Sequence, residues 1–146
     1  MTKRRIFAII IAVVLGTVCL VGIRLGMNPK VQAWVFVARY GDYIEEKYEQ
    51  HIIITDGVPC ISATYFNAGY RHEMIDYSLS GFGIAPSSTY YGVYYSPDDL
   101  PMAYAQMNYH LVKQSEGYWT WEEKGGDNHG EVAKIREGWY YYSASF

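Results

Sequence analysis

The sequence predicts an α+β fold: an N-terminal transmembrane helix, then an amphipathic helix packed on an antiparallel β-sheet of about five strands. An uncharged apolar run covers residues 6–23, and hydrophobic residues recur at helical spacing over residues 28–50. The rest of the chain consists of short β-prone segments separated by turn residues. The 16 tyrosines among 146 residues also favour a sheet, because aromatic side chains are enriched in strands.

The N-terminal apolar run is long enough to span a membrane. Residues 6–23 read IFAIIIAVVLGTVCLVGI without a charge. At about 1.5 Å per residue this helix is roughly 27 Å long, close to the ~30 Å hydrocarbon layer of a bilayer. The three basic residues at positions 3–5 outnumber Arg24 and Lys30 on the other side. The positive-inside rule therefore places the N-terminus in the cytoplasm.

A cleaved secretory signal and a lipoprotein signal are the alternatives to this anchor. Cleavage needs small residues at both positions of an A-x-A-like site, and Leu20 or Arg24 occupies one position of each candidate site. A lipidated Cys19 would follow Val18, where a small residue is expected. We therefore expect an uncleaved anchor in contact with membrane lipid.

The expected organisation is a single-pass protein of the cell membrane in two parts. Residues 1–27 form the cytoplasmic N-terminus and the anchor, and residues 28–146 form one extracytoplasmic domain. Four basic residues belong to the anchor, so 8 bases remain against 15 acids, a net charge of about −7. An acidic domain repels phosphate backbones, which argues against a nucleic-acid partner. Cys60 is the single cysteine of the domain, so no intramolecular disulfide is expected.

The domain is expected to begin with a helix. Asn28 followed by Pro29 is a helix-start signal, because Asn caps free amide groups and Pro suits the first helical position. Apolar residues then recur at helical spacing up to about Gln50. Gly41, followed by Asp42, leaves open a break into two shorter helices.

Short strands are expected after the helix. Residues 74–81 and 89–96 are predicted to form a hairpin, and residues 60–66 are either strand or helix. The other candidate strands are 52–55, 106–113, 118–123 and 132–145. Trp139 to Tyr142 place bulky rings on both sheet faces, so we expect the last strand to lie inside the sheet.

The sequence contains no specific catalytic motif. A nucleophile elbow, G-x-S-x-G, is absent, and no local signature supports Cys60 as a nucleophile. The acids that an enzyme could use are Asp76, Asp98, Asp99 and Asp127, although Asp98 and Asp99 after Pro97 also fit an ordinary turn. No catalytic residue is assigned.

No metal or cofactor site is assigned either. The four histidines do not lie three or four residues from another His or Cys, the usual spacing of ligands; they are His51, His72, His110 and His129. Residues 127–131 offer oxygen ligands but lack the alternating pattern of a calcium loop. A hairpin turn is the expected structure there.

Several segments of the second half resemble uncharacterised proteins of Gram-positive anaerobes. They are 75–78 (IDYS), 81–84 (GFGI), 88–99 (STYYGVYYSPDD), 126–128 (GDN) and 139–146 (WYYYSASF). These proteins are similarly short and N-terminally anchored and have no assigned activity. The resemblance implies the localisation and the fold, and it carries over no site residue.

The expected function is a noncatalytic interaction module at the cell envelope that presents tyrosines to a protein or glycan partner. The alternative is a small membrane-anchored extracytoplasmic enzyme that uses carboxylates. A pocket with two converging carboxylates would favour the enzyme, whereas an aromatic surface would favour binding.

Overall fold

The computed structural model describes residues 16, 28–67, 72–84 and 87–146. These residues form one long helix, one 3-10 turn and seven strands. The elements are α2 (Pro29–Glu49), β1 (Ser62–Phe66), β2 (Met74–Ile84), β3 (Ser87–Tyr95), η1 (Tyr104–Gln106), β4 (Val112–Ser115), β5 (Tyr118–Glu122), β6 (His129–Arg136) and β7 (Trp139–Ser145).

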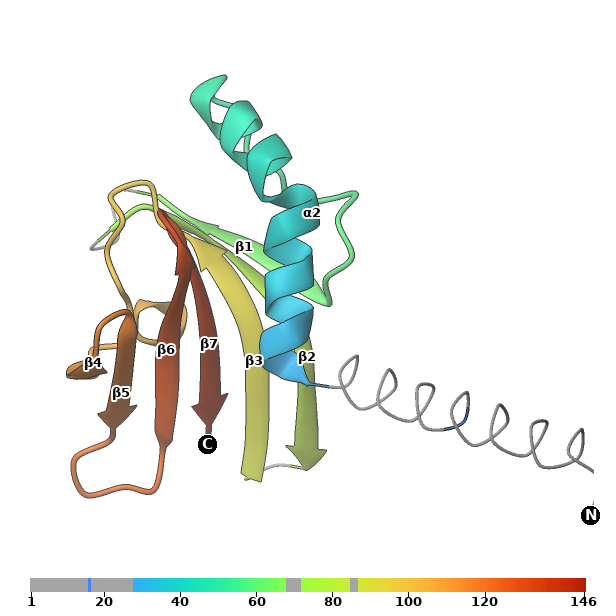
Figure 1. The fold of residues 1–146 in the computed structure, drawn as a ribbon. Helices are drawn as coiled ribbons and strands as arrows, with labels where there is room; N and C mark the ends of the chain where they lie inside the picture. Colours follow the sequence, from blue (N-terminus) through green and yellow to red (C-terminus); the bar gives the residue numbers. More distant parts are fainter. Residues whose placement is uncertain (1–15, 17–27, 68–71, 85–86) are drawn as a thin grey trace, which may run out of the picture.

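The seven strands make one antiparallel sheet in the order β1-β2-β3-β7-β6-β5-β4. The C-terminal strand β7 lies in the middle, between β3 and β6, and α2 lies across one face of the sheet (Figure 1). The expectation that the last strand lies inside the sheet is confirmed. Phe146 extends this pairing, because its backbone exchanges two hydrogen bonds of 2.8 Å with Ser88.

The expected α+β fold with about five strands is wrong, because the described residues form a mostly β domain of seven strands and one helix. Gly138, at φ 72°, turns the chain back within residues 132–145, so one predicted strand is the hairpin β6–β7. Residues 52–55 are a connection rather than a strand. Within residues 106–113, η1 ends and β4 begins, without a continuous strand.

The predicted transmembrane helix at residues 6–23 lies outside the described residues, apart from Gly16. In the part of the chain that the structure describes, no helix combines the length and the apolar character needed to cross a membrane. The helix of the described domain, Pro29–Glu49, packs on the sheet instead.

The helix α2 begins as the sequence predicts. The Asn28 side chain accepts a hydrogen bond of 2.9 Å from the Lys30 amide, which caps the first turn. The helix continues through Gly41 without a break. A β-carbon at Gly41 would lie 2.5 Å from Nη2 of Arg136, so glycine here lets the arginine pass against the helix.

Two polar contacts and an aromatic core fix α2 to the sheet. Glu45 accepts hydrogen bonds of 2.6 Å from both Arg136 and the indole nitrogen of Trp139. Phe36 packs against Tyr77 and Trp139 in the core beneath the helix. Because side chains alternate along a strand, the neighbours of these core residues point to the opposite face of the sheet.

The opposite, open face carries a second buried cluster. Tyr140 and Tyr142 of β7 point to this face, whereas Trp139 and Tyr141 point to the helix. Tyr94 stacks on Tyr140 with ring centroids 5.1 Å apart. The sheet is therefore covered by aromatic side chains on both sides, and a helix covers only one of them.

Candidate functional site

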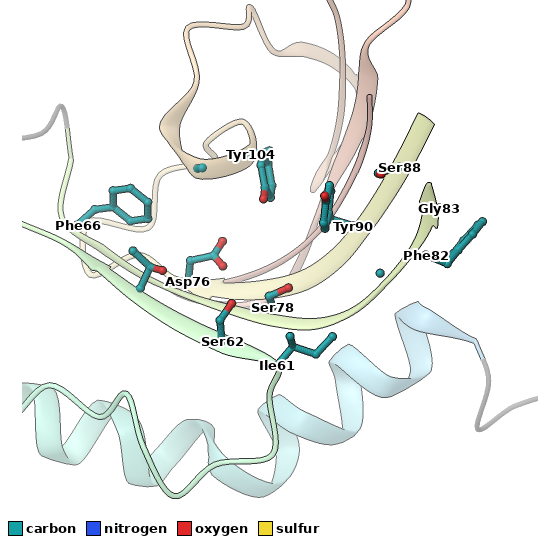
Figure 2. A pocket seen from close by; sticks show the side chains of 13 residues that line it. Ile61, Ser62, Phe66, Asp76, Ser78, Phe82, Gly83, Ser88, Tyr90 and Tyr104 are labelled. Carbon is teal, nitrogen blue, oxygen red and sulfur yellow. The ribbon is translucent and has the colours of Figure 1, made fainter. Parts of the chain in front are cut away.

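The open face of the sheet is hollowed beside β1, β2 and β3 into a cleft of about 380 Å³, which we name the Asp76 cleft (Figure 2). Its polar lining is Asp76 and the hydroxyl groups of Ser62, Thr64, Ser78 and Ser88. Its aromatic lining includes Phe66, Tyr90 and Tyr104. The volume lies at the lower end of the usual range for small-molecule sites, about 300 to 1,000 Å³.

Asp76 lies on β2 between Ile75 and Tyr77, which both belong to the core beneath the helix. Strand alternation therefore directs its carboxyl group to the open face, where Figure 2 shows it pointing toward the side on which Tyr104 lies. The residue is only 8% exposed. A carboxyl group is thus placed in the interior at the base of an open cleft.

The two oxygens of Asp76 have different surroundings. The Tyr142 hydroxyl donates a hydrogen bond of 3.2 Å to Oδ1. Oδ2 is buried and has no hydrogen-bond partner among the described residues. Burial raises the pKa of Asp76 to about 7, and the Tyr142 hydrogen bond opposes this rise only in part. Asp76 therefore holds its proton to much higher pH than an ordinary aspartate does.

Tyr90 and Tyr104 form an aromatic wall of the cleft. Their rings are nearly parallel, at 18°, with centroids 5.9 Å apart. Phe146 packs against both rings, which ties the wall to the end of the central strand. Tyr104 belongs to η1, which the Gln106 side chain fastens to the backbone of His72 through two hydrogen bonds of 2.5 and 3.2 Å.

The other acids that the sequence singled out do not converge on Asp76. Asp99 lies in the turn after β3, where its Oδ1 accepts hydrogen bonds of 2.8 Å from the Gly138 amide and the Tyr140 hydroxyl. Asp98 and Asp127 are exposed and do not line the cleft. Asp76 is the one carboxylate in the described lining of the cleft.

Asp99 is a structural residue of a turn. Partial burial favours its neutral form, but the Lys134 ammonium, the Gly138 amide and the Tyr140 hydroxyl outweigh burial, so the pKa of Asp99 lies below its usual value. The ion pair with Lys134 joins the turn to β6. A carboxylate held in its charged form by three donors is poorly suited to proton transfer at neutral pH.

The histidines and Cys60 also lack a site. The four histidines are exposed, and the described residues contain no group of three His, Cys, Asp or Glu side chains placed to hold a metal ion. Cys60 is half-buried against the core beneath the helix, and burial raises the pKa of its thiol. Of residues 127–131, which were expected to form a hairpin turn, 127–128 lie in the turn between β5 and β6, whereas 129–131 begin β6.

A second cleft, of about 420 Å³, lies at the C-terminal end of α2. Tyr48, Tyr65 and Tyr95 line it together with Glu49 and Glu73. The Tyr65 hydroxyl already donates a hydrogen bond to Glu73, and hydrogen bonding to Glu73 helps burial to raise the pKa of Tyr48. Of the two acids in this cleft, Glu73 is thus engaged by neighbouring tyrosines, whereas Oδ2 of Asp76 has no hydrogen-bond partner among the described residues.

Sequence reasoning named Asp76 only as one of four acids, and it did not identify Tyr104 as a site residue. The alternation along residues 74–81 was the available signal, because it places Asp76 on the face opposite Ile75 and Tyr77. Nothing in the sequence brings η1 over that face.

Comparison of the chain with protein-family models, with curated proteins and with solved structures finds no match. The resemblance to anchored proteins of Gram-positive anaerobes stays a prediction from the sequence.

Proposed function

We propose that the domain is a noncatalytic binding module that holds a glycan of the cell envelope in the Asp76 cleft. The observation that carries this proposal is the unpartnered Oδ2 of Asp76, at the base of an open cleft lined by hydroxyl groups and tyrosine rings. A ligand that supplies a donor to this oxygen removes the cost of a buried acceptor, about 1 to 3 kcal/mol.

The composition of the cleft suits a sugar. A sugar ring has apolar C–H faces, which pack on aromatic rings, and a rim of hydroxyl groups, which pair with polar side chains. Tyr90 is 37% exposed and provides a ring for stacking, while Ser62, Thr64 and Ser78 provide hydroxyl groups from two adjacent strands. The cleft is too small for a folded protein partner to enter, whereas one or two sugar units match a site of this volume.

The alternative of an enzyme that uses carboxylates receives no support from the cleft. Glycoside hydrolysis, for example, needs two carboxyl groups about 5 to 10 Å apart on either side of the bond that breaks. The described lining of the cleft contains Asp76 alone, and Asp99 is engaged by its own turn. A single carboxyl group is sufficient for binding.

The location at the cell envelope is supported by the N-terminal sequence. The uncharged residues 6–23, after the three basic residues at positions 3–5, are typical of a single-pass anchor with a cytoplasmic N-terminus. In this arrangement residues 28–146 lie outside the membrane, where envelope glycans are found.

Co-sedimentation of the full-length protein, in mild detergent, with insoluble N-acetylglucosamine polymer and with purified cell walls tests the proposal. Wild-type protein is expected to sediment with at least one of these materials. Tyr90→Ala is expected to weaken binding about tenfold, the loss of a good stacking contact. Tyr43→Ala is the matched control, because Tyr43 is an exposed tyrosine of α2 outside the Asp76 cleft.

Circular dichroism at increasing temperature verifies that each variant is folded before binding is compared. Absence of wild-type binding to both materials, or equal binding by folded Tyr90→Ala and Tyr43→Ala, would contradict the proposal.

A further inference from the structure

The charge of Asp76 has no counter-charge among the described residues of the cleft. No Lys, Arg or His side chain is among the described residues that line it, and the remaining lining consists of hydroxyl groups, rings, small residues and aliphatic groups. Buried charges in proteins are normally paired, because an isolated ion is costly to remove from water. Among the described residues that line the cleft, Asp76 therefore has no positively charged partner.

A protonated amine completes this arrangement better than a neutral hydroxyl group does. An ammonium group has up to three hydrogen-bond donors and a positive charge. It can therefore both donate a hydrogen bond to Oδ2 and offset the charge of the carboxylate. A hydroxyl group supplies one donor and no charge. The faces of Tyr90 and Tyr104 attract a cation as well, through the negative potential of aromatic rings.

The segment that carries Tyr104 has a strained backbone and lies on the side of the cleft toward which Asp76 points. Oδ2 of Asp76 is withdrawn from solvent, and Figure 2 shows its carboxyl group directed toward the side where Tyr104 lies. Ala105 and Gln106, which follow Tyr104, have φ values of 46° and 56°. Non-glycine residues in this region store strain, and a ligand donor reaches the buried Oδ2 only when the wall of the cleft shifts.

From this geometry we infer that the Asp76 cleft selects an amino sugar, a glycan unit with a free, protonated primary amine, and that Asp76 is its counter-ion. The inference rests on the proposed glycan-binding function and specifies its ligand. Binding converts the neutral carboxylic acid and the ammonium ligand into a carboxylate–ammonium pair, and the proton of Asp76 passes to the buffer.

The groups that face Asp76 do not titrate in the same pH range. Burial raises the pKa of Tyr142 on β7, of Tyr94 on β3 and of Tyr104 on η1, so these phenols stay neutral. The same holds for Cys60, whose raised pKa reflects burial and, to a smaller extent, the charges of Asp56 and Asp76. A proton released near pH 6 is therefore assigned to Asp76, whose pKa is about 7.

Titration calorimetry of the full-length protein at pH 6 tests the inference with two tetrasaccharides of the same backbone. One contains free glucosamine units and the other contains N-acetylglucosamine units. Repeating each titration in two buffers of different ionisation enthalpy gives the number of protons released. The glucosamine tetramer is expected to bind about tenfold more tightly or better, the effect of a charged hydrogen bond. It is also expected to show a net release of protons, since the raised pKa leaves Asp76 largely protonated at pH 6 before the ligand binds.

The variants Asp76→Asn and Asp127→Asn form a matched pair, because Asp127 lies in an exposed turn outside the cleft. Asp76→Asn is expected to lose the preference for the glucosamine tetramer and the proton release, while Asp127→Asn keeps both. The proton count on wild-type protein is informative even if Asp76→Asn does not fold.

The outcomes separate this inference from the proposed function. Equal affinity for the two tetramers, or tight binding of the glucosamine tetramer without proton release, would overturn the amino-sugar inference and leave glycan binding intact. If neither tetramer binds, ethanolamine is titrated as a simple amine. Binding of ethanolamine that depends on Asp76 and releases a proton would support amine recognition and refute the glycan, whereas no binding would overturn both.

Discussion

Tyr142 on β7 donates a hydrogen bond of 3.2 Å to Oδ1 of Asp76 on β2, although β3 lies between these two strands. The tyrosine reaches across because Gly92, the β3 residue paired with Tyr142, has no side chain. A β-carbon at Gly92 would lie 2.5 Å from the Tyr142 hydroxyl oxygen. One glycine in the middle of the sheet thus permits the contact that holds Asp76 in place.

Gly92→Ala is expected to destabilise the domain by about 1 to 3 kcal/mol, the usual cost of overpacking. The new methyl group would also lie 2.4 Å from the backbone oxygen of Tyr77, which cannot move aside as a side chain can. Urea unfolding monitored by fluorescence measures the loss. Gln114→Ala, at an exposed position of β4, is expected to change stability by no more than about 0.5 kcal/mol. A Gly92→Ala protein as stable as wild type would show that Tyr142 does not lie over Gly92.

The stability of the domain is expected to fall as the pH rises from about 4 to about 8. The pKa of Asp76 is about 7 in the folded chain against an ordinary value of 3.8, so the folded state binds this proton more tightly than the unfolded state. The stabilisation is complete below the unfolded pKa and is lost as the pH rises through the folded pKa. The free energy of unfolding lost through Asp76 over this pH range is at most on the order of 4 kcal/mol.

Asp76→Asn isolates this effect, because an amide does not titrate. As the pH rises from 4 to 8, the melting temperature of wild type is expected to fall steadily relative to that of Asp76→Asn. Asp99 acts in the opposite sense and at lower pH, since its lowered pKa contributes stability that is lost as the pH falls below about 4. If the difference in melting temperature between the two proteins stayed constant across pH 4 to 8, the pKa of Asp76 would not be raised in the folded chain.

Asp99 is expected to behave as a structural residue rather than as a catalytic or binding one. Asp99→Ala removes the acceptor for the Gly138 amide and the Tyr140 hydroxyl and is expected to cost about 2 to 3 kcal/mol. Asp99→Asn keeps that acceptor and tolerates the φ of 52° at this position, so it is expected to cost clearly less. Asp98→Ala, at the exposed neighbouring position, is the control. Equal losses for Asp99→Ala and Asp98→Ala in chemical unfolding would refute this role.

The proposed topology predicts that the domain is accessible from outside the cell. Cys60 is a poor reporter, because it is half-buried and its raised thiol pKa leaves little reactive thiolate. Asp127→Cys places a thiol on an exposed hairpin turn instead. A membrane-impermeant maleimide is expected to label this variant on intact cells more strongly than wild type. Labelling that requires permeabilised cells would reverse the proposed orientation.

Local signals allowed the sequence to predict several elements of the fold. The cap at Asn28, the helix that ends near Gln50 and the hairpin of β2 and β3 depend on residues close together in the chain. The number of strands was wrong for local reasons too, since the turn at Glu137 and Gly138 lies within one long β-prone run. Charged residues and a glycine lie within positions 134–138 of this run, a turn signal that the prediction of one continuous strand passed over.

The cleft could not be predicted, because it depends on contacts between distant parts of the chain. Asp76 and Tyr142 form a hydrogen bond although they lie 66 positions apart in the sequence. Tyr104 covers the same face from a short turn that has no periodic sequence pattern. Strand alternation indicates only which face Asp76 points to. The order of the strands, which places β7 beside β3, decides what stands over that face.

Nuclear magnetic resonance of the ¹³C-labelled full-length protein tests the central claim most directly, by following the Asp76 carboxyl carbon during titration with the glucosamine tetramer at pH 6. This carbon is expected to shift toward the value of an ionised carboxylate, with accompanying changes at Tyr90 and Tyr104 and none at the turn around Asp127. Unchanged signals from Asp76, Tyr90 and Tyr104 at ligand saturation, or changes confined to the cleft of Tyr48 and Glu73, would contradict it.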